Sequence, residues 1–324
     1  MNCLVISDTF PNRREPSRGP YNRRQIEELA RLCDVRVINP ISWVRLAKQP
    51  RLLRVIKAGS DGLLDNVRIM HPLHVHVPLL GRPMLARSLG RCVRRHVQGF
   101  APAAGFDVVY STWAFPHGHA AMQIARRYGL PYVAKLRGSD INALPARGRR
   151  RRLAARAVAE ADAVVAVSRE LADKAVAMGA AAGRVHLLHN GVDLERFRPA
   201  SRDAARGRLP VAAGRKVVLF LGSLLPVKAP GVLLEAFARA GARTEASLVF
   251  VGTGALRGRL LARARRPDIA GRVLCVGGVP HEDVALWLNA ADVLCLPSLS
   301  EGCPNVVLEA LACGTPVVAS RVGA

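Results

Sequence analysis

Short apolar runs rich in β-branched residues alternate along the chain with longer amphipathic stretches. One amphipathic stretch begins after Ser168, a residue type that caps helix N-termini, and ends near Gly179, a residue type that closes helix C-termini. Such alternation of strand-length and helix-length segments is typical of βαβ units around a parallel sheet. In the first half we predict strands at 3–7, 35–39, 67–70, 108–110, 132–135, 163–167 and 185–188.

A polar stretch that contains proline and arginine interrupts the alternation at 196–215, and the pattern restarts at 216–221. Further strands are predicted at 248–251, 273–276, 293–296 and 317–319. We therefore predict two Rossmann-like α/β domains with doubly wound parallel sheets, at 1–195 and 216–324, joined by a linker at 196–215. The sequence stops directly after a strand with no helix to cover that sheet edge, so we expect the second domain to be incomplete.

The composition favours a folded protein of the cytoplasm. Half of the residues are apolar, which supplies two cores of ordinary size and argues against disorder. We find neither a run of about 18 apolar residues nor a basic leader before an apolar segment, which disfavours a membrane-spanning or secreted protein. The seven cysteines are scattered without a C-x-x-C pair, so we interpret them as reduced core residues rather than metal ligands.

The formal net charge of +24 has two interpretations. Arginine-rich composition alone accounts for it, or the field draws the protein to anionic lipid, phosphorylated substrates or nucleic acid. The charge is concentrated at 147–152 and at 82–95, where Leu85, Leu89 and Val93 recur at helical spacing among arginines. A basic amphipathic helix of this kind is typical of a membrane surface, and a solvated helix face is the alternative. We expect an anionic membrane surface as a partner.

The segment 297–310 carries the strongest chemical signal. It lies between two predicted strands and combines a glycine loop with a helix start, where Pro304 is predicted near the first helical position. Ligands of such folds bind at the carboxyl edge of the sheet, and a helix N-terminus offers free amides to a diphosphate. Glu301 on the loop and Glu309 in the helix can therefore address different parts of one ligand.

At these residues the chain resembles the retaining family 4 glycosyltransferases, whose fold, named GT-B, has two Rossmann-like domains facing across a cleft. Glu301 and Glu309 have the spacing of that family's E-x7-E motif, and 312–320 matches its trailing A-x-G-x-P-V-V-A-S segment. The resemblance implies that Glu309 holds the ribose of a nucleotide and that Glu301 contacts the transferred sugar. It also implies a donor site that includes Gly302, Pro304, Asn305 and Val306.

The segment 220–228 resembles the family's donor-phosphate loop. The resemblance implies that Gly222 lets the backbone approach the diphosphate and that Lys228 neutralises it. Ser223 stands where many relatives have arginine, so diphosphate binding is expected to depend on Lys228 alone. Glycine turns at Gly252 and at Gly278, which Val279 follows, match further parts of the donor domain.

Three segments of the first half resemble acceptor-domain blocks of exopolysaccharide and cell-wall-polymer members of the family. Gly19 is implied to bring backbone amides toward the donor diphosphate. Arg137 replaces the histidine of many relatives; it cannot act as a base, but it can stabilise negative charge on a phosphate. On the acceptor side the resemblance implies Trp113, His117 and Asp140, and for His117 a structural role is the alternative.

The resemblance implies a retaining, hexosyltransferase-like enzyme whose catalytic residues are Glu301, Arg137 and Lys228. The donor substrate is expected to be a nucleotide sugar such as a UDP- or GDP-sugar, and the acceptor a polysaccharide or lipid-linked saccharide at the cytoplasmic membrane face. No D-x-D pair suited to a metal is present, and we expect neither a metal nor another cofactor. A catalytically inactive membrane-associated partner protein of the same fold is the alternative. A basic nucleic-acid-binding protein is disfavoured because only 5% of residues are aromatic.

Overall fold

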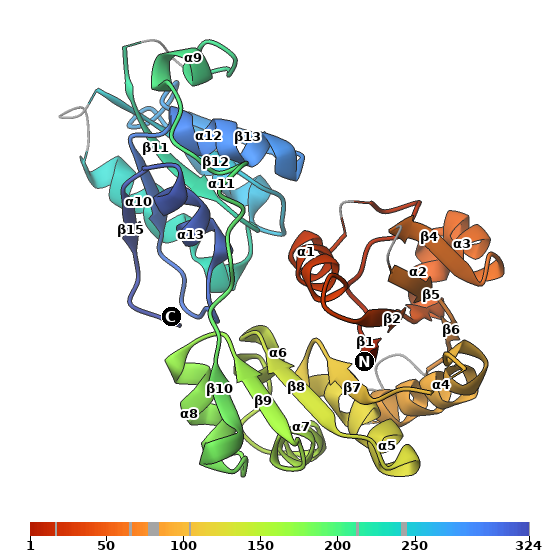
Figure 1. The fold of residues 1–324 in the computed structure, drawn as a ribbon. Helices are drawn as coiled ribbons and strands as arrows, with labels where there is room; N and C mark the ends of the chain where they lie inside the picture. The colour runs from red at the N-terminus through yellow and green to blue at the C-terminus, as the bar shows by residue number, and fades with distance from the viewer. Residues whose placement is uncertain are drawn as a thin grey trace. The chain divides into compact units, whose positions relative to one another are not determined.

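The computed structural model describes residues 1–16, 18–64, 67–76, 84–103, 105–211, 214–240 and 245–323, with the backbone alone at 60–64. The chain forms two compact units, Met1–His189 and Asn190–Ala324 (Figure 1). Each unit is built on a parallel sheet with helices between its strands, so the predicted fold class is confirmed. The stretch 196–215, predicted as a linker, lies in the second unit, where α9 (Arg202–Arg206) contacts α12 (Val284–Ala290).

The first unit contains an eight-stranded sheet with the order β10-β9-β8-β7-β1-β2-β5-β4. Seven strands are parallel, and each lies where the sequence predicts a strand, to within a residue at either end. Their bounds are β1 Asn2–Ile6, β2 Asp34–Ile38, β5 Val67–Met70, β7 Val108–Ser111, β8 Tyr132–Leu136, β9 Ala163–Ala166 and β10 Val185–Leu187.

The edge strand β4 (Ser60–Leu64), which pairs antiparallel with β5, was not predicted from the sequence. Nor was the small parallel pair of β3 (Ile41–Ser42) and β6 (Leu73–His74). The residues of β4 begin with Ser-Asp-Gly, which are depleted in strands, so local pattern gave no reason to expect it.

The helices of the first unit cover both faces of its sheet. In Figure 1, α4, α5 and α7 lie side by side, and they contact one another in that order. The N-cap of α8 is Ser168, whose Oγ accepts a hydrogen bond from the Leu171 amide, and Gly179 follows the helix with φ 102°, so both predicted helix ends are confirmed. The helices are α1 Pro20–Leu29, α2 Trp43–Lys48, α3 Leu53–Lys57, α4 Leu85–Phe100, α5 His119–Tyr128, α6 Ser139–Asn142, α7 Arg149–Ala159 and α8 Arg169–Ala177.

The second unit contains a five-stranded parallel sheet with the order β13-β12-β11-β14-β15. All five strands were predicted; they are β11 Lys216–Leu221, β12 Ala246–Val251, β13 Val273–Gly277, β14 Val293–Leu296 and β15 Val317–Ala319. Between or after them lie α10 Pro230–Ala240, α11 Arg257–Ala264, α12 and α13 Asn305–Ala312.

Side-chain alternation along β11 and β12 builds a core on each face of this sheet. Phe220 and Phe250 are partners in the parallel register, and their ring centroids lie 5.5 Å apart in one core. The preceding partners, Leu219 and Val249, point to the opposite core, which also contains Trp287. Because the strands are parallel, the loops after β11, β12, β13 and β14 all leave the same edge of the sheet. These four loops, together with the helix α13 that follows the last of them, contain the donor residues predicted in this unit.

Candidate functional site

Two glycine loops at the carboxyl edge of the second sheet lie in direct backbone contact. A Cβ atom on Gly252 would lie 1.9 Å from the carbonyl oxygen of Gly222, and the backbone of Gly252 has φ 148°. The Gly222 amide donates to the Val251 carbonyl at 3.0 Å, and the Leu224 amide donates to the Thr253 carbonyl at 2.8 Å. A glycine is therefore required at 252 for the loops after β11 and β12 to approach each other.

The turn after β13 continues this edge. The Gly252 amide donates to the Gly277 carbonyl at 2.7 Å, which joins the turn to the loop after β12. A Cβ on Gly278 would lie 3.3 Å from the Thr253 methyl group, and Val279 packs against the core on one face of the sheet. The structure thus brings the predicted residues of these three loops to one sheet edge.

Lys228 and Glu301 form an ion pair that joins two of the loops. Lys228 ends the 3-10 turn Pro226–Lys228 after β11, and Glu301 lies in the loop after β14, the neighbouring strand. The Lys228 Nζ atom lies 2.5 Å from Glu301 Oε1 and 2.7 Å from Oε2. The Leu299 amide donates to the Val227 carbonyl at 2.8 Å, so backbone contact supports the pair. Ser223, by contrast, is exposed.

Glu309 lies in the second turn of α13 with its side chain 3% exposed. Its Oε1 atom lies 3.3 Å from His281 Nε2, whereas its Oε2 atom is buried and has no hydrogen-bond partner within the described residues. The ring of His281 packs edge-on against Phe197, with centroids 5.7 Å apart. A buried carboxylate oxygen of this kind can accept a hydrogen bond from a ligand hydroxyl.

His281 was not predicted as a site residue. It follows the glycine turn at Gly278 in the same loop after β13, and this position was the available signal. A single histidine with no motif of its own is weak evidence, and only the packing of its loop against α13 brings it to Glu309.

The N-terminus of α13 differs by one residue from the prediction. Pro304 is the N-cap, with φ −73° and ψ 104°, and the helix begins at Asn305. Pro304 was predicted near the first helical position; its extended ψ keeps it just outside the helix. Asn305 accepts a hydrogen bond from the Asn190 side chain at 2.8 Å, and Val306 packs against both cores. The Gly302 carbonyl lies close to Gly323, where an added Cβ would approach it to 2.7 Å.

In the first unit, Gly19 holds the start of α1 against the loop after β1. Its backbone is left-handed, with φ 60°, and an added Cβ would lie 2.3 Å from the Thr9 carbonyl oxygen. The Asn22 side chain donates to the same carbonyl at 2.7 Å, and the Arg18 guanidinium donates to the Asp8 carbonyl at 3.1 Å. Gly19 thus has a packing reason to be glycine, besides the predicted approach of its amide to a phosphate.

Asp8 and His117 meet at the carboxyl edge of the first sheet. The buried His117 Nε2 atom lies 3.4 Å from Asp8 Oδ1, and the Thr9 hydroxyl donates to the same carboxylate oxygen at 2.7 Å. Burial raises the pKa of Asp8, but His117 and the Thr9 hydrogen bond outweigh that effect and hold the pKa below its ordinary value. The Trp113 ring lies 6.1 Å from that of His117. Asp8 was not predicted as a site residue, although a carboxylate after a strand was a usable signal.

Asp140 holds two loops of the first unit together. Its carboxylate accepts hydrogen bonds from the backbone amides of Ala114, Arg137 and Gly138 at 2.9–3.0 Å. Burial raises the pKa of Asp140, and these amides oppose the increase. With both oxygens used by the backbone, Asp140 is placed to fix the loop after β8. Arg137 is partly buried on that loop, and burial lowers the pKa of its guanidinium.

Within the described residues, no group of three or more histidine, cysteine, aspartate or glutamate side chains is arranged to hold a metal ion. Among the helices described, none combines the length and apolar character that a membrane span requires.

Comparison with known proteins gives consistent matches for both units. The family model described as Glycosyltransferase Family 4 matches residues 19–196, and the model described as Glycosyl transferases group 1 matches residues 215–324. D-inositol 3-phosphate glycosyltransferase 1 of Catenulispora acidiphila is 35% identical over 303 residues, which cover 86% of this chain and 69% of the relative. TuaC of Bacillus subtilis, whose name places it in teichuronic acid biosynthesis, is 28% identical over 100% of this chain and 82% of its own.

Solved structures match the whole chain at low identity. Sucrose-phosphate synthase from Thermosynechococcus elongatus matches with a TM-score of 0.80 at 21% identity, over 100% of this chain and 82% of that one. Anabaena HepE, solved in complex with UDP, matches with a TM-score of 0.72 at 18% identity, over 100% of this chain and 81% of that one. At such identities the likeness establishes the fold alone.

Proposed function

The chain belongs to glycosyltransferase family 4, and from this premise we propose that it transfers a sugar from a nucleotide-sugar donor with retention of anomeric configuration. The proposed donor is a UDP- or GDP-sugar, in line with the UDP complex of Anabaena HepE. The proposed acceptor is a polysaccharide or lipid-linked saccharide at the cytoplasmic face of an anionic membrane. The name of TuaC supports a polymer acceptor.

One arrangement carries this proposal. The Lys228–Glu301 pair and the N-terminus of α13 lie at the carboxyl edge of one parallel sheet, together with the buried Glu309 carboxylate. A cation and free helix amides suit a diphosphate, and a carboxylate oxygen without a partner suits a ribose or sugar hydroxyl. The chemistry of these groups therefore matches the three parts of a nucleotide sugar.

In the proposed mechanism, the diphosphate gains negative charge as its bond to the sugar breaks. Lys228 and the amides at the start of α13 would stabilise that charge. Glu301 would share Lys228 with the phosphate and would contact a sugar hydroxyl. Arg137 would add a permanent positive charge from the first unit. We propose that these cations and amides act without a metal.

Substitution of Glu309 tests the assignment. We expect Glu309→Gln to reduce sugar transfer at least 100-fold, because the amide nitrogen cannot accept the ligand hydrogen bond. The matched control is Glu282→Gln, which changes an exposed glutamate of the same unit and should leave transfer unchanged. Full activity in the Glu309 variant would refute the assignment.

A thermal-shift screen of UDP, GDP and their sugars addresses the base and the sugar. Stabilisation by one nucleotide identifies the base, since a ligand that binds only the folded state raises the unfolding temperature. Stabilisation without hydrolysis or transfer of the sugar would instead identify the chain as an inactive partner protein of the same fold.

A further inference from the structure

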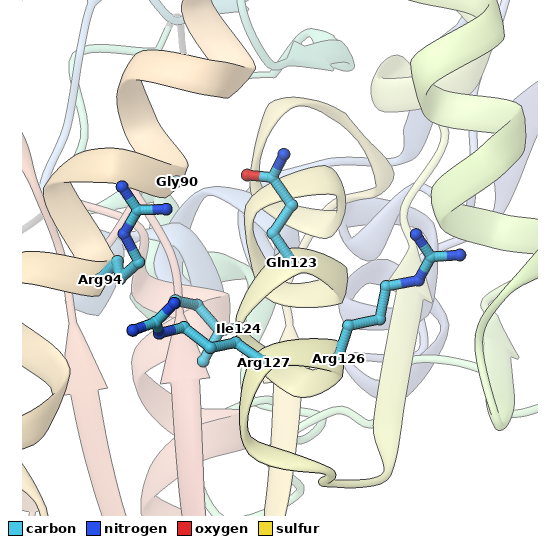
Figure 2. Close-up of a pocket in the computed structure, with 6 residues that line it drawn as sticks. All are labelled: Gly90, Arg94, Gln123, Ile124, Arg126 and Arg127. Atoms are coloured by element: carbon cyan, nitrogen blue, oxygen red, sulfur yellow. The ribbon is translucent and has the colours of Figure 1, made fainter.

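A cavity of about 520 Å³ lies between α4 and α5, and none of the residues assigned above lines it. Figure 2 shows the side chains around it, and we call it the arginine pocket. Its lining consists of Gly90, Arg94, Gln123, Ile124, Arg126 and Arg127.

Close contact between the two helices forms the inner part of the arginine pocket. A Cβ on Gly90 would lie 2.3 Å from the Gln123 Oε1 atom, so the glycine lets α5 approach α4 at this point. Ile124 is 1% exposed, whereas Arg94 and Arg127 are exposed. The pocket therefore has an inner surface of packed atoms and arginines at its opening.

The three arginines differ in their partners. Arg126 forms an ion pair with Glu160 at 2.5 Å, and Glu160 also binds Arg156 at 2.8 Å. In the part of the chain that the structure describes, no carboxylate lies within ion-pair distance of Arg94 or Arg127. Figure 2 shows these two guanidinium groups on one side of the pocket and Arg126 directed to the other. Arg94 and Arg127 are thus available to an external anion.

The surrounding surface has the same sign of charge. Together α4 and α5 contain six arginines and neither aspartate nor glutamate. The apolar side of α4 is packed into the first unit, with Leu89 2% and Val93 0% exposed. This face of α4 therefore cannot insert into a bilayer, and Arg82 of the predicted basic segment lies outside the described residues. What α4 offers to a membrane is its arginine side.

We propose that the arginine pocket binds the phosphate group of an anionic phospholipid headgroup and so attaches the first unit to a bilayer. Guanidinium groups form paired hydrogen bonds with phosphate oxygens, and Arg94 and Arg127, which have no carboxylate partner among the described residues, favour such an anion. Among the described residues, no aromatic side chain lines the pocket to stack on a base, which disfavours nucleic acid. The inference rests on the membrane location in the proposed function, but it uses none of the donor residues.

Vesicle binding tests the proposal, with phosphatidylcholine vesicles that either contain or lack phosphatidylglycerol. We expect the protein to bind only the anionic vesicles. The double variant Arg94→Gln/Arg127→Gln should weaken that binding about 30-fold, because each arginine near an anionic surface contributes a similar share of the binding free energy. The control Arg265→Gln/Arg266→Gln removes the same charge from exposed positions of the second unit and should weaken binding less than about threefold.

Four outcomes would overturn the proposal. The first two are equal binding to neutral and anionic vesicles, and equal losses of binding in the two double variants. The third is displacement of the protein from vesicles by inorganic pyrophosphate at a matched phosphate concentration. The fourth is displacement by duplex DNA that depends on the same two arginines. Donor hydrolysis is measured with the same protein preparations in the absence of vesicles. An active enzyme that ignores vesicles contradicts the pocket alone, and an inactive protein that binds them contradicts only the transferase proposal.

Discussion

Lys228 and Glu301 bind each other across two loops that are 73 residues apart in sequence, with the lysine Nζ atom in contact with both carboxylate oxygens. The side chain of Glu301 is 8% exposed and that of Lys228 is 26% exposed. From the sequence, the two residues were predicted to contact different parts of the donor. Because the two groups are paired, a diphosphate bound at the proposed site would compete with Glu301 for the lysine.

We expect the two residues to contribute unequally to stability. Lys228→Met should lower the free energy of unfolding by about 1–3 kcal/mol, because it leaves the more buried carboxylate without its lysine. Glu301→Gln should lower the free energy of unfolding by less, because the more exposed Lys228 can be solvated by water. Urea unfolding of both variants and of the double variant gives the coupling energy. Additive losses would show that the pair does not hold the loops.

Gly252 should tolerate no side chain. Gly252→Ala places a Cβ against the Gly222 carbonyl, and we expect a loss of about 3 kcal/mol or more in the free energy of unfolding, together with weaker donor binding. Gly258→Ala is the control, because its Cβ meets nothing within 4 Å in the helix α11, and it should stabilise by about 0.5 kcal/mol. Similar stabilities of the two variants would contradict the close approach of the loops.

His74 should make the first unit sensitive to mild acid. Burial lowers the pKa of His74 to about 4, helped by the nearby charges of His76 and His117 and opposed by Asp8. The unfolded chain takes up this proton near pH 6.5, so unfolding binds a proton between about pH 6.5 and 4. The stability contributed by neutral His74 is complete above that range and is lost as the pH falls through it, by up to about 3 kcal/mol.

Chemical denaturation between pH 7.5 and 4.5 measures this effect. His74→Gln can keep the contact with the Ser88 hydroxyl but cannot titrate, so its stability should decline less steeply. His186→Gln, at an exposed position of β10, is the control and should follow the native protein. Parallel curves for the His74 variant and the native protein would rule out this contribution.

His281 is expected to position Glu309 for the donor. His281→Phe keeps the aromatic contact with Phe197 but removes the ring nitrogen beside Glu309, and we expect KM for the donor to rise about tenfold with little change in kcat. His281→Gln retains a hydrogen-bond donor and should recover part of the loss. Steady-state kinetics at varied donor concentration measures KM and kcat for both variants. Equal KM values for both variants would mean that the histidine is only a packing residue.

Much of the fold could be predicted because its signals are local. Apolar runs marked every parallel strand of the eight-stranded and five-stranded sheets, and Ser168 with Gly179 marked both ends of α8. Backbone preferences and side-chain alternation act over a few residues, so the sequence displays them directly. The strand β4 was not predicted because its pairing with β5, rather than its own composition, makes it a strand.

The candidate site divides in the same way. The sequence alone indicated the spacing of Glu301 and Glu309 and the glycine loops, because a motif depends on residue types at short separation. The contacts of Lys228 with Glu301, of His281 with Glu309 and of Asp8 with His117 were not. Each joins loops from different strands, and which loops meet depends on the order of strands in the sheet. Strand order is decided by packing over the whole unit, which no local pattern encodes.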